Sequence, residues 1–142
     1  MAWKPKRFNT KKLRSGFEDR IAANLKERGI AYGYETVRLH YTKLCCKKCG
    51  EVVNSGRYTP DFVFQRASGI RLLVEAKGRM DSATRSKMLR VKRDNPSEDI
   101  RFLFQRDNTI GKSSVTRYSQ WSLKHGFPCA IGETIPQSWI DG

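Results

Sequence analysis

The sequence has no segment that would place the protein in a membrane or direct it out of the cell. None of its 142 residues belongs to a run of about 18 apolar residues, which a membrane-spanning helix needs. The N-terminus is basic, but the apolar segment of a secretory signal peptide does not follow it. We therefore expect an intracellular protein with no membrane partner.

The chain also has few cysteines, and their spacing does not fit a disulfide framework. Cys45, Cys46 and Cys49 lie close together, whereas Cys129 stands alone. A cluster of this kind is typical of a metal knuckle or of free thiols. We therefore expect no structural disulfide.

Acidic residues are half as numerous as basic ones, 14 against 28, so the formal net charge is +14. The hydrophobic fraction of 38% still suffices for a core, and the length fits one domain. Such an excess of positive charge favours a polyanion as partner, most commonly nucleic acid. Membrane surfaces and heparin-like polymers would also bind such a charge. The net charge alone therefore does not identify an activity.

The pattern along the chain predicts a basic arm followed by one domain. Residues 1–14 carry six basic residues and no acid, so we expect a flexible arm there and a domain over 15–142. From Ser15 to Gly29, apolar side chains recur every four residues, which predicts a helix with Ser15 and Glu18 as its capping box. A strand over 32–40 and a Cys-rich loop over 42–57 should follow.

Two clearer strands come next. The runs 58–65 and 71–77 are rich in β-branched and aromatic residues, and the turn between them predicts an antiparallel hairpin. The remaining pattern predicts a helix over 82–94, a strand over 100–105, a helix over 114–125 and a last helical turn over 136–140. The predicted fold class is α/β, with a mixed central sheet and flanking helices.

This hairpin would bring two carboxylates and a lysine together. If its turn is centred on Ser68, apolar residues face apolar residues and Asp61 lies opposite Glu75, with Cβ atoms about 5 Å apart. Lys77 shares the face of Glu75 because side chains alternate along a strand. Mg²⁺ would offset the repulsion between the carboxylates and leave positions for a scissile phosphate and a water. Lys77 would orient or deprotonate that water, or stabilise the charge that develops on the phosphate.

Pro60-Asp61 followed by Glu75-Ala76-Lys77 resembles the PD-(D/E)xK nuclease signature. More of the chain resembles the phage endonuclease I family of Holliday-junction resolvases. The matching segments, in order, are RSGFED (14–19), YTPDF (58–62), VEAKG (74–78), DIR (99–101), KHG (124–126), Ile135-Pro136 and Trp139-Ile140. The resemblance covers about residues 14–140.

The resemblance implies a restriction-endonuclease-like, segment-swapped homodimer that uses Mg²⁺ or Mn²⁺ to cut four-way and other branched DNA. It implies that Asp61, Glu75 and Lys77 act from one protomer and Glu18 from the other, and that the Ala76 carbonyl joins Asp61 and Glu75 as a metal ligand. Alternatively, Glu18 only caps its own helix and has no catalytic role. A phage-encoded protein of this kind would act in the host cytoplasm.

The Cys-rich stretch departs from the family pattern. Cys46-x-x-Cys49-Gly50 resembles half of a zinc knuckle, which predicts a structural Zn²⁺ whose remaining ligands are open. They would be Cys45, His40, His125 or Cys129 of the same chain, or the same cysteine pair of a dimer partner. His125 has an alternative role at the end of a helix.

Basic side chains on the arm and on the 82–94 helix are expected to contact DNA phosphates. They are Lys4, Lys6, Arg7, Lys11, Lys12, Arg85, Lys87, Arg90, Lys92 and Arg93, with Lys43, Lys47 and Lys48 as a third patch. Because few side chains look placed to read bases, we expect selection by the shape of a branch point. The alternative functions are a zinc-knuckle nucleic-acid-binding module without catalysis and a sequence-specific restriction-type nuclease.

Overall fold

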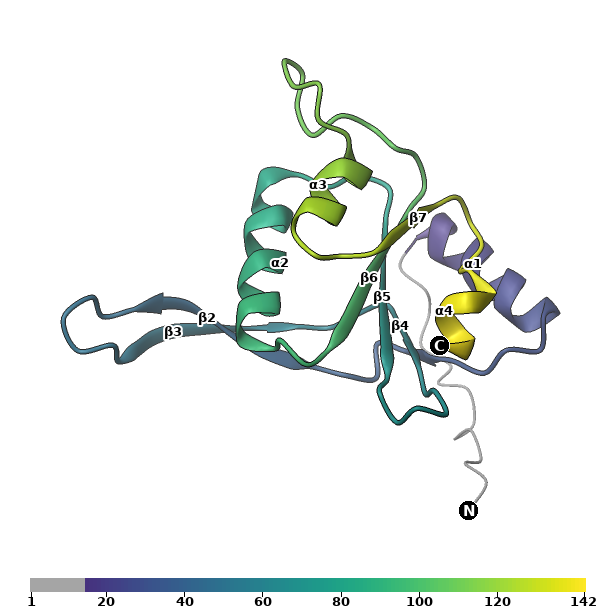
Figure 1. Cartoon of the computed structure of the whole chain (residues 1–142), viewed down its shortest axis with the longest axis horizontal. Helices are drawn as coiled ribbons and strands as arrows, with labels where there is room; N and C mark the ends of the chain where they lie inside the picture. The colour runs from purple at the N-terminus through teal and green to yellow at the C-terminus, as the bar shows by residue number, and fades with distance from the viewer. Residues whose placement is uncertain (1–14) are drawn as a thin grey trace.

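A computed structural model describes residues 15–142 of the chain. The predicted basic arm, with Lys4, Lys6, Arg7, Lys11 and Lys12, lies outside these described residues. Within them, the chain forms a mixed five-stranded sheet flanked by helices and a separate two-stranded ribbon (Figure 1). This arrangement confirms the predicted α/β class with a mixed central sheet. None of the helices in 15–142 is long and apolar enough to cross a membrane.

The central sheet is antiparallel on one side and parallel on the other. Its strands run in the order β1 (Gly33–Tyr34), β4 (Phe62–Phe64), β5 (Leu72–Lys77), β6 (Asp99–Phe104) and β7 (Cys129–Ile131). The β1–β4 and β4–β5 pairs are antiparallel, and the β5–β6 and β6–β7 pairs are parallel. The chain crosses from β5 to β6 through α2 (Ser82–Asp94), as a parallel pair requires.

The β4–β5 hairpin has the register that the sequence predicted. Its paired residues are Phe62 with Val74, Val63 with Leu73 and Phe64 with Leu72. Val63 and Leu73 belong to the core on one face of the sheet, and Phe62 and Val74 to the core on the other. Because both faces are covered, a slip by one residue would exchange the side chains of the two cores.

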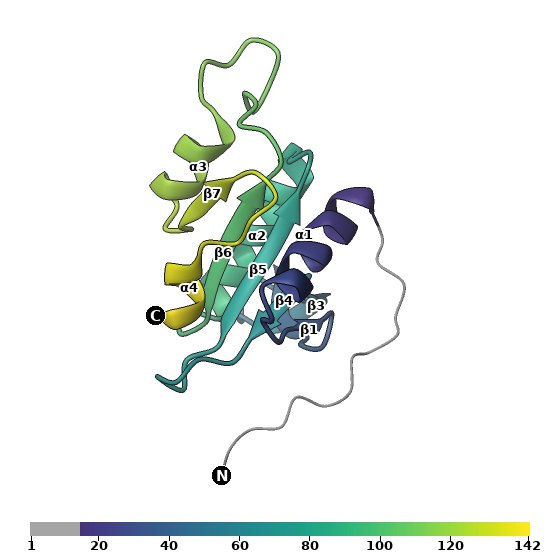
Figure 2. The ribbon, with the colours of Figure 1, turned by 90° about the vertical axis from the view of Figure 1, so that its right-hand side faces the viewer.

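Helices cover both faces of the sheet. The core that holds Val63 and Leu73 also contains residues of α2 and of α3 (Tyr118–Lys124). The opposite core contains residues of α1 (Gly16–Glu27) and of α4 (Gln137–Asp141). Figure 2 shows α1 and α2 on opposite sides of β5. The sheet is therefore the middle layer of three.

Helix α1 begins and ends as predicted. The Ser15 hydroxyl accepts a hydrogen bond from the Glu18 main-chain N–H at 3.2 Å, and this bond caps the first turn. Phe17, Ile21 and Leu25 form its buried face. Gly29, with a φ of +69°, turns the chain away after the last turn.

The prediction of a loop over 42–57 is wrong. This segment contains most of two antiparallel strands, β2 (Leu39–Cys45) and β3 (Val52–Tyr58), joined by a turn over 46–51. At its base, Leu39 and Tyr41 point into the core while His40 between them is exposed. The cysteines, lysines and glycines hid this strand signal. The strand predicted over 32–40 corresponds to β1 and the first two residues of β2, with a break between them.

Two smaller predictions also need correction. Helix α3 begins at Tyr118 rather than near 114, because the preceding residues form a loop closed by a bridge between Thr109 and Arg117. Strand β7 was not predicted. It has only three residues and exists through its pairing with β6, which local sequence does not reveal.

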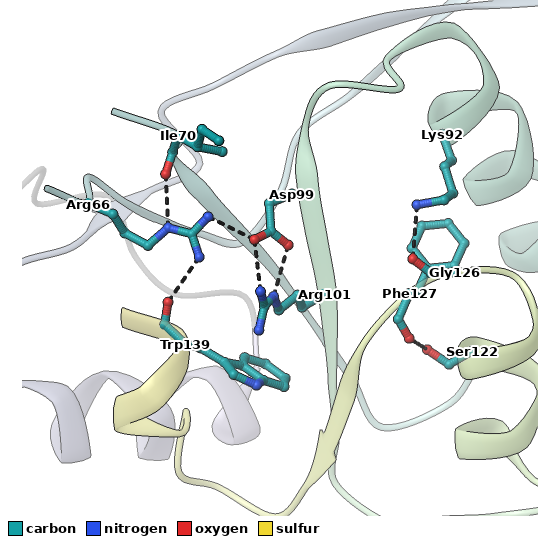
Figure 3. A network of polar contacts seen from close by, with 9 residues as sticks. All are labelled: Arg66, Ile70, Lys92, Asp99, Arg101, Ser122, Gly126, Phe127 and Trp139. Atoms are coloured by element: carbon teal, nitrogen blue, oxygen red, sulfur yellow. Dashed lines mark hydrogen bonds and ion pairs between the residues drawn. The ribbon is translucent and has the colours of Figure 1, made fainter. Parts of the chain in front are cut away.

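A network of ion pairs fixes α4 and the hairpin turn to β6 (Figure 3). Asp99 binds the guanidinium groups of both Arg66 and Arg101, each at 2.8 Å. Arg66 also donates to the main-chain oxygen of Trp139 at 3.1 Å, and Arg101 lies 5.3 Å from the centre of the Trp139 ring. Because the Arg66 side chain is nearly buried, loss of Asp99 would leave an unpaired buried charge, a costly change.

Candidate active site

A cavity of about 390 Å³ opens where β3, β5, α1 and α2 meet. Its lining combines acidic, basic and small polar side chains: Glu18, Arg57, Tyr58, Thr59, Asp61, Glu75, Ala76, Lys77, Thr84, Lys87 and Met88. All four catalytic residues predicted from the sequence, Glu18, Asp61, Glu75 and Lys77, lie in this cavity.

Asp61 and Glu75 are buried and held by hydrogen bonds. One carboxylate oxygen of Asp61 accepts from the main-chain N–H of Ala76 at 2.8 Å. The two oxygens of Glu75 are divided between the Tyr58 hydroxyl, at 2.8 Å, and the Lys77 ammonium, at 3.0 Å. Asp61 is 8% exposed and Glu75 is 6% exposed. Two acidic groups with little access to water therefore share one cavity.

The pKa values of both buried carboxyl groups are raised. Burial, followed by the charge of Glu75, raises the pKa of Asp61 to about 8. Burial also raises the pKa of Glu75, although Lys77 and the Tyr58 hydroxyl oppose the rise. A cation placed between them would relieve this repulsion and favour both ionised forms.

Lys77 is held in its charged form. Burial disfavours the ammonium, but the Glu75 carboxylate outweighs this effect and the pKa of Lys77 is raised. A protonated lysine is a hydrogen-bond donor and a poor general base. Of the roles that the sequence left open for Lys77, a charged ammonium suits hydrogen-bond donation better than proton abstraction.

Sequence reasoning missed Tyr58 and the role of α2 in the site. Tyr58, the last residue of β3, is 2% exposed and donates to Glu75. Lys87 of α2 lies 5.6 Å from the centre of the Tyr58 ring and its charge favours the ionised form of Glu75. Tyr58 lies three residues before Asp61 in the Tyr58-Thr59-Pro60-Asp61 segment, and this closeness to a predicted catalytic residue could have indicated its place in the site.

Among the described residues, only the Ser15 half of the predicted capping box is seen at the start of α1, and the Glu18 carboxylate lies in the cavity. The main-chain N–H of Glu18 bonds to Ser15 at the helix start, while its carboxylate accepts from the Tyr34 hydroxyl at 2.6 Å and lines the cavity. In this single chain, Glu18 and Asp61 share one cavity. The exchange of Glu18 between protomers stays a prediction.

The donor set fits a hard divalent cation. Within residues 15–142, no group of three or more His, Cys, Asp or Glu side chains is arranged to hold a metal ion. The cavity instead offers the carboxylates of Asp61 and Glu75 beside Ala76. Mg²⁺ typically takes one or two carboxylates and completes its shell with water and phosphate oxygens, so these donors suit Mg²⁺ or Mn²⁺.

The predicted DNA-binding residues of α2 fall into two groups. Lys87 lines the cavity and Arg90 is exposed. Arg85 and Arg93 donate to main-chain oxygens of neighbouring segments, and Lys92 donates to that of Gly126 at 2.9 Å (Figure 3). Lys87 and Arg90 are therefore the members of this helix best placed for phosphate contacts.

The predicted zinc ligands lie away from this cavity. Cys46 and Cys49 occupy the turn at the far end of the β2–β3 ribbon, at the left of Figure 1. Cys129 lies on β7, and His125 caps α3 with its ring 4.7 Å from that of Trp121. The cysteine turn thus belongs to a separate part of the molecule.

Comparisons with known proteins identify the family of the chain. The sequence model of the phage endonuclease I family matches residues 1–142. Endonuclease I of Escherichia phage T7 is 33% identical over 129 residues, which cover 90% of this chain and 78% of the relative. Endodeoxyribonuclease 1 of Enterobacteria phage T3 is 34% identical over 116 residues, 80% of this chain and 68% of the relative. The chain therefore belongs to the phage endonuclease I family and is a nuclease.

Proposed function

We propose that this chain is a metal-dependent endodeoxyribonuclease that resolves four-way and other branched DNA junctions as a homodimer. The observation that carries the proposal is the convergence of Asp61, Glu75 and Lys77 in one cavity that Arg57 and Lys87 also line. The T3 relative is named an endodeoxyribonuclease, which supports DNA as the substrate. Both relatives are phage proteins, so we propose the host cytoplasm as the place of action.

Asp61, Glu75 and the Ala76 carbonyl would hold Mg²⁺ or Mn²⁺. When bound, such an ion polarises the phosphate and makes a coordinated water more acidic. Tyr58 and Lys77 fix the two oxygens of Glu75, so this carboxylate is presented in one orientation. Lys77 then donates to the attacking water or to a phosphate oxygen, where negative charge increases during hydrolysis.

Binding would rest on charge rather than on base contacts. Lys87 and Arg57 line the cavity and Arg90 extends the basic surface along α2. Such side chains contact phosphates and carry little sequence information. A flexible branch point can bend to place a strand in the cavity, so shape would decide which phosphate is cut.

Two observations support a homodimer with exchanged segments. A four-way junction has two strands to cut, and a two-fold dimer offers two equivalent sites. The β2–β3 ribbon is the connection between α1 with β1 and the rest of the sheet. If the stretch that joins α1 to Asp61 crossed from one protomer to the other, the α1 of one protomer would pack on the sheet of its partner and deliver Glu18 in trans.

A direct test compares a labelled four-way junction with a linear duplex that contains the same arm sequences. We expect paired incisions near the branch with Mg²⁺ or Mn²⁺, and none with EDTA. The duplex should stay largely intact. Cleavage of both DNAs at one sequence would instead identify a restriction-type enzyme, and binding without any cleavage would identify a binding module.

A further inference from the structure

The β2–β3 ribbon projects from the domain and is largely uncovered at its far end. Helix α2 packs against its base, where Asn95 donates to the main-chain oxygen of His40 at 2.9 Å. Farther out, the apolar side chains of Leu44 and Val52 are 57% and 55% exposed. Figure 1 shows this end at the left, away from the central sheet. The far end lacks the helix that supports the base, so it offers a free surface on which another molecule can pack.

The turn at this end has the form of a metal knuckle. The Cys46 main-chain N–H donates to the Glu51 oxygen, and the Gly50 N–H donates to the Cys46 oxygen, each at 2.8 Å. Gly50 has a φ of +74°, which lets the chain reverse after Cys49. Cys46 and Cys49 therefore lie in one closed turn.

The residues of this turn suit zinc. Zn²⁺ is bound by cysteine sulfur, and Cys46-x-x-Cys49 followed by Gly50 has the spacing of half a zinc knuckle. Lys47 and Lys48 stand between the two cysteines and add positive charge at the turn, which offsets the negative charge of zinc-bound thiolates. The knuckle thus supplies two good ligands.

Over its described residues, the same chain does not supply a third and a fourth zinc ligand near the cysteine turn. Among residues 15–142, no three potential ligands are gathered. Cys129 lies on β7 in the central sheet, where burial raises the pKa of its thiol. His125 packs against Trp121 at the end of α3. Because structural zinc is almost always four-coordinate, the remaining ligands have to come from another molecule.

We propose that two copies of this chain share one structural Zn²⁺, held by Cys46 and Cys49 of each copy at the ends of their ribbons. Four thiolates give the zinc a tetrahedral sulfur shell, and the bound pair covers the exposed apolar side chains beside the knuckle. The site fixes the two ribbons to each other and takes no part in DNA cleavage. It stands apart from the proposed nuclease chemistry.

The test measures metal content and mass together on protein purified without chelator in the presence of reductant. We expect one zinc per two chains, and a Co²⁺-loaded sample with intense cobalt–thiolate absorption. The double variant Cys46→Ser, Cys49→Ser should lose the metal and weaken self-association at least tenfold. The matched variants Cys45→Ser and Cys129→Ser should keep both properties.

Three results would overturn the proposal. One zinc per chain would show a site completed within each copy. Loss of zinc in the Cys45→Ser or Cys129→Ser variant would show a different set of ligands. Protein free of zinc that also takes up no Zn²⁺ or Co²⁺ when titrated would show that the knuckle is not a metal site. Because none of these measurements uses DNA, failure of the proposed nuclease function would leave their outcome unchanged.

Discussion

The Tyr58 hydroxyl is predicted to control how well the site binds its metal. It donates to Glu75 at 2.8 Å from a nearly fully buried position, and it favours the ionised form of that carboxyl. Tyr58→Phe removes only the hydroxyl and keeps the ring in the core. Glu75 then loses a donor inside a cavity with little water, and its pKa rises further.

The expected size of the effect follows from the type of hydrogen bond. A bond to a charged group contributes about 1.5–3 kcal/mol, which corresponds to roughly a 10- to 150-fold change in an equilibrium. We therefore expect the Mg²⁺ concentration for half-maximal junction cleavage to rise by roughly this factor. The defect should be larger near pH 6 than near pH 8, because protons compete with the metal for Glu75 at lower pH.

Single-turnover cleavage of a four-way junction across a Mg²⁺ titration measures this effect. Tyr41→Phe is the matched control, since Tyr41 lies on the neighbouring strand β2 in the same core and does not line the cavity. The control should behave as wild type. If Tyr58→Phe also keeps the wild-type Mg²⁺ dependence at both pH values, the assignment of Tyr58 as the residue that positions Glu75 is refuted.

Three further predictions concern charge in the cavity. Lys77→Ala should reduce cleavage at least a hundredfold with little loss of junction binding, and a mobility-shift assay in Ca²⁺ would contradict this if affinity fell in parallel. The pKa of Asp61 is about 8 in the folded chain and 3.8 in its ordinary state, so between these pH values the folded, metal-free protein holds a proton that the unfolded chain has lost. The free energy of unfolding should therefore fall as the pH rises from about 4 to about 8. Asp61→Asn should make the melting temperature depend less on pH in this range. Co-refolding Glu18→Ala and Asp61→Ala chains should restore nicking if Glu18 acts in trans, and mixed dimers that remain inactive would refute the exchange.

The hairpin and its carboxylates were predictable because their signals are local. The alternation of apolar residues in 58–65 and 71–77 fixes one register in which both faces are buried, and the structure has that register. Asp61 and Glu75 follow from it as neighbours. The start of α1 after Ser15 was equally local, since it depends on the Ser15 side chain and on Glu18, the third residue of the helix.

The features that sequence reasoning missed depend on contacts between distant segments. The three residues of β7 form a strand only against β6, and the ribbon strands were hidden by cysteines, lysines and glycines that suit a turn. Tyr58 enters the site because β3 ends beside β5. Sequence left the Glu18 side chain open between a helix cap and a catalytic site. Its place beside Tyr34 in the cavity depends on the fold, whereas the Ser15 cap uses only the main-chain N–H of Glu18.

The measurement that most directly tests the account is single-turnover cleavage of a four-way junction by Asp61→Asn, with junction affinity measured on the same preparation. Asp61 is buried and accepts from the Ala76 N–H, so asparagine can occupy its place with little change of shape. The account predicts a loss of cleavage of at least a thousandfold in Mg²⁺ with near wild-type affinity for the junction. Cleavage at close to the wild-type rate would contradict it.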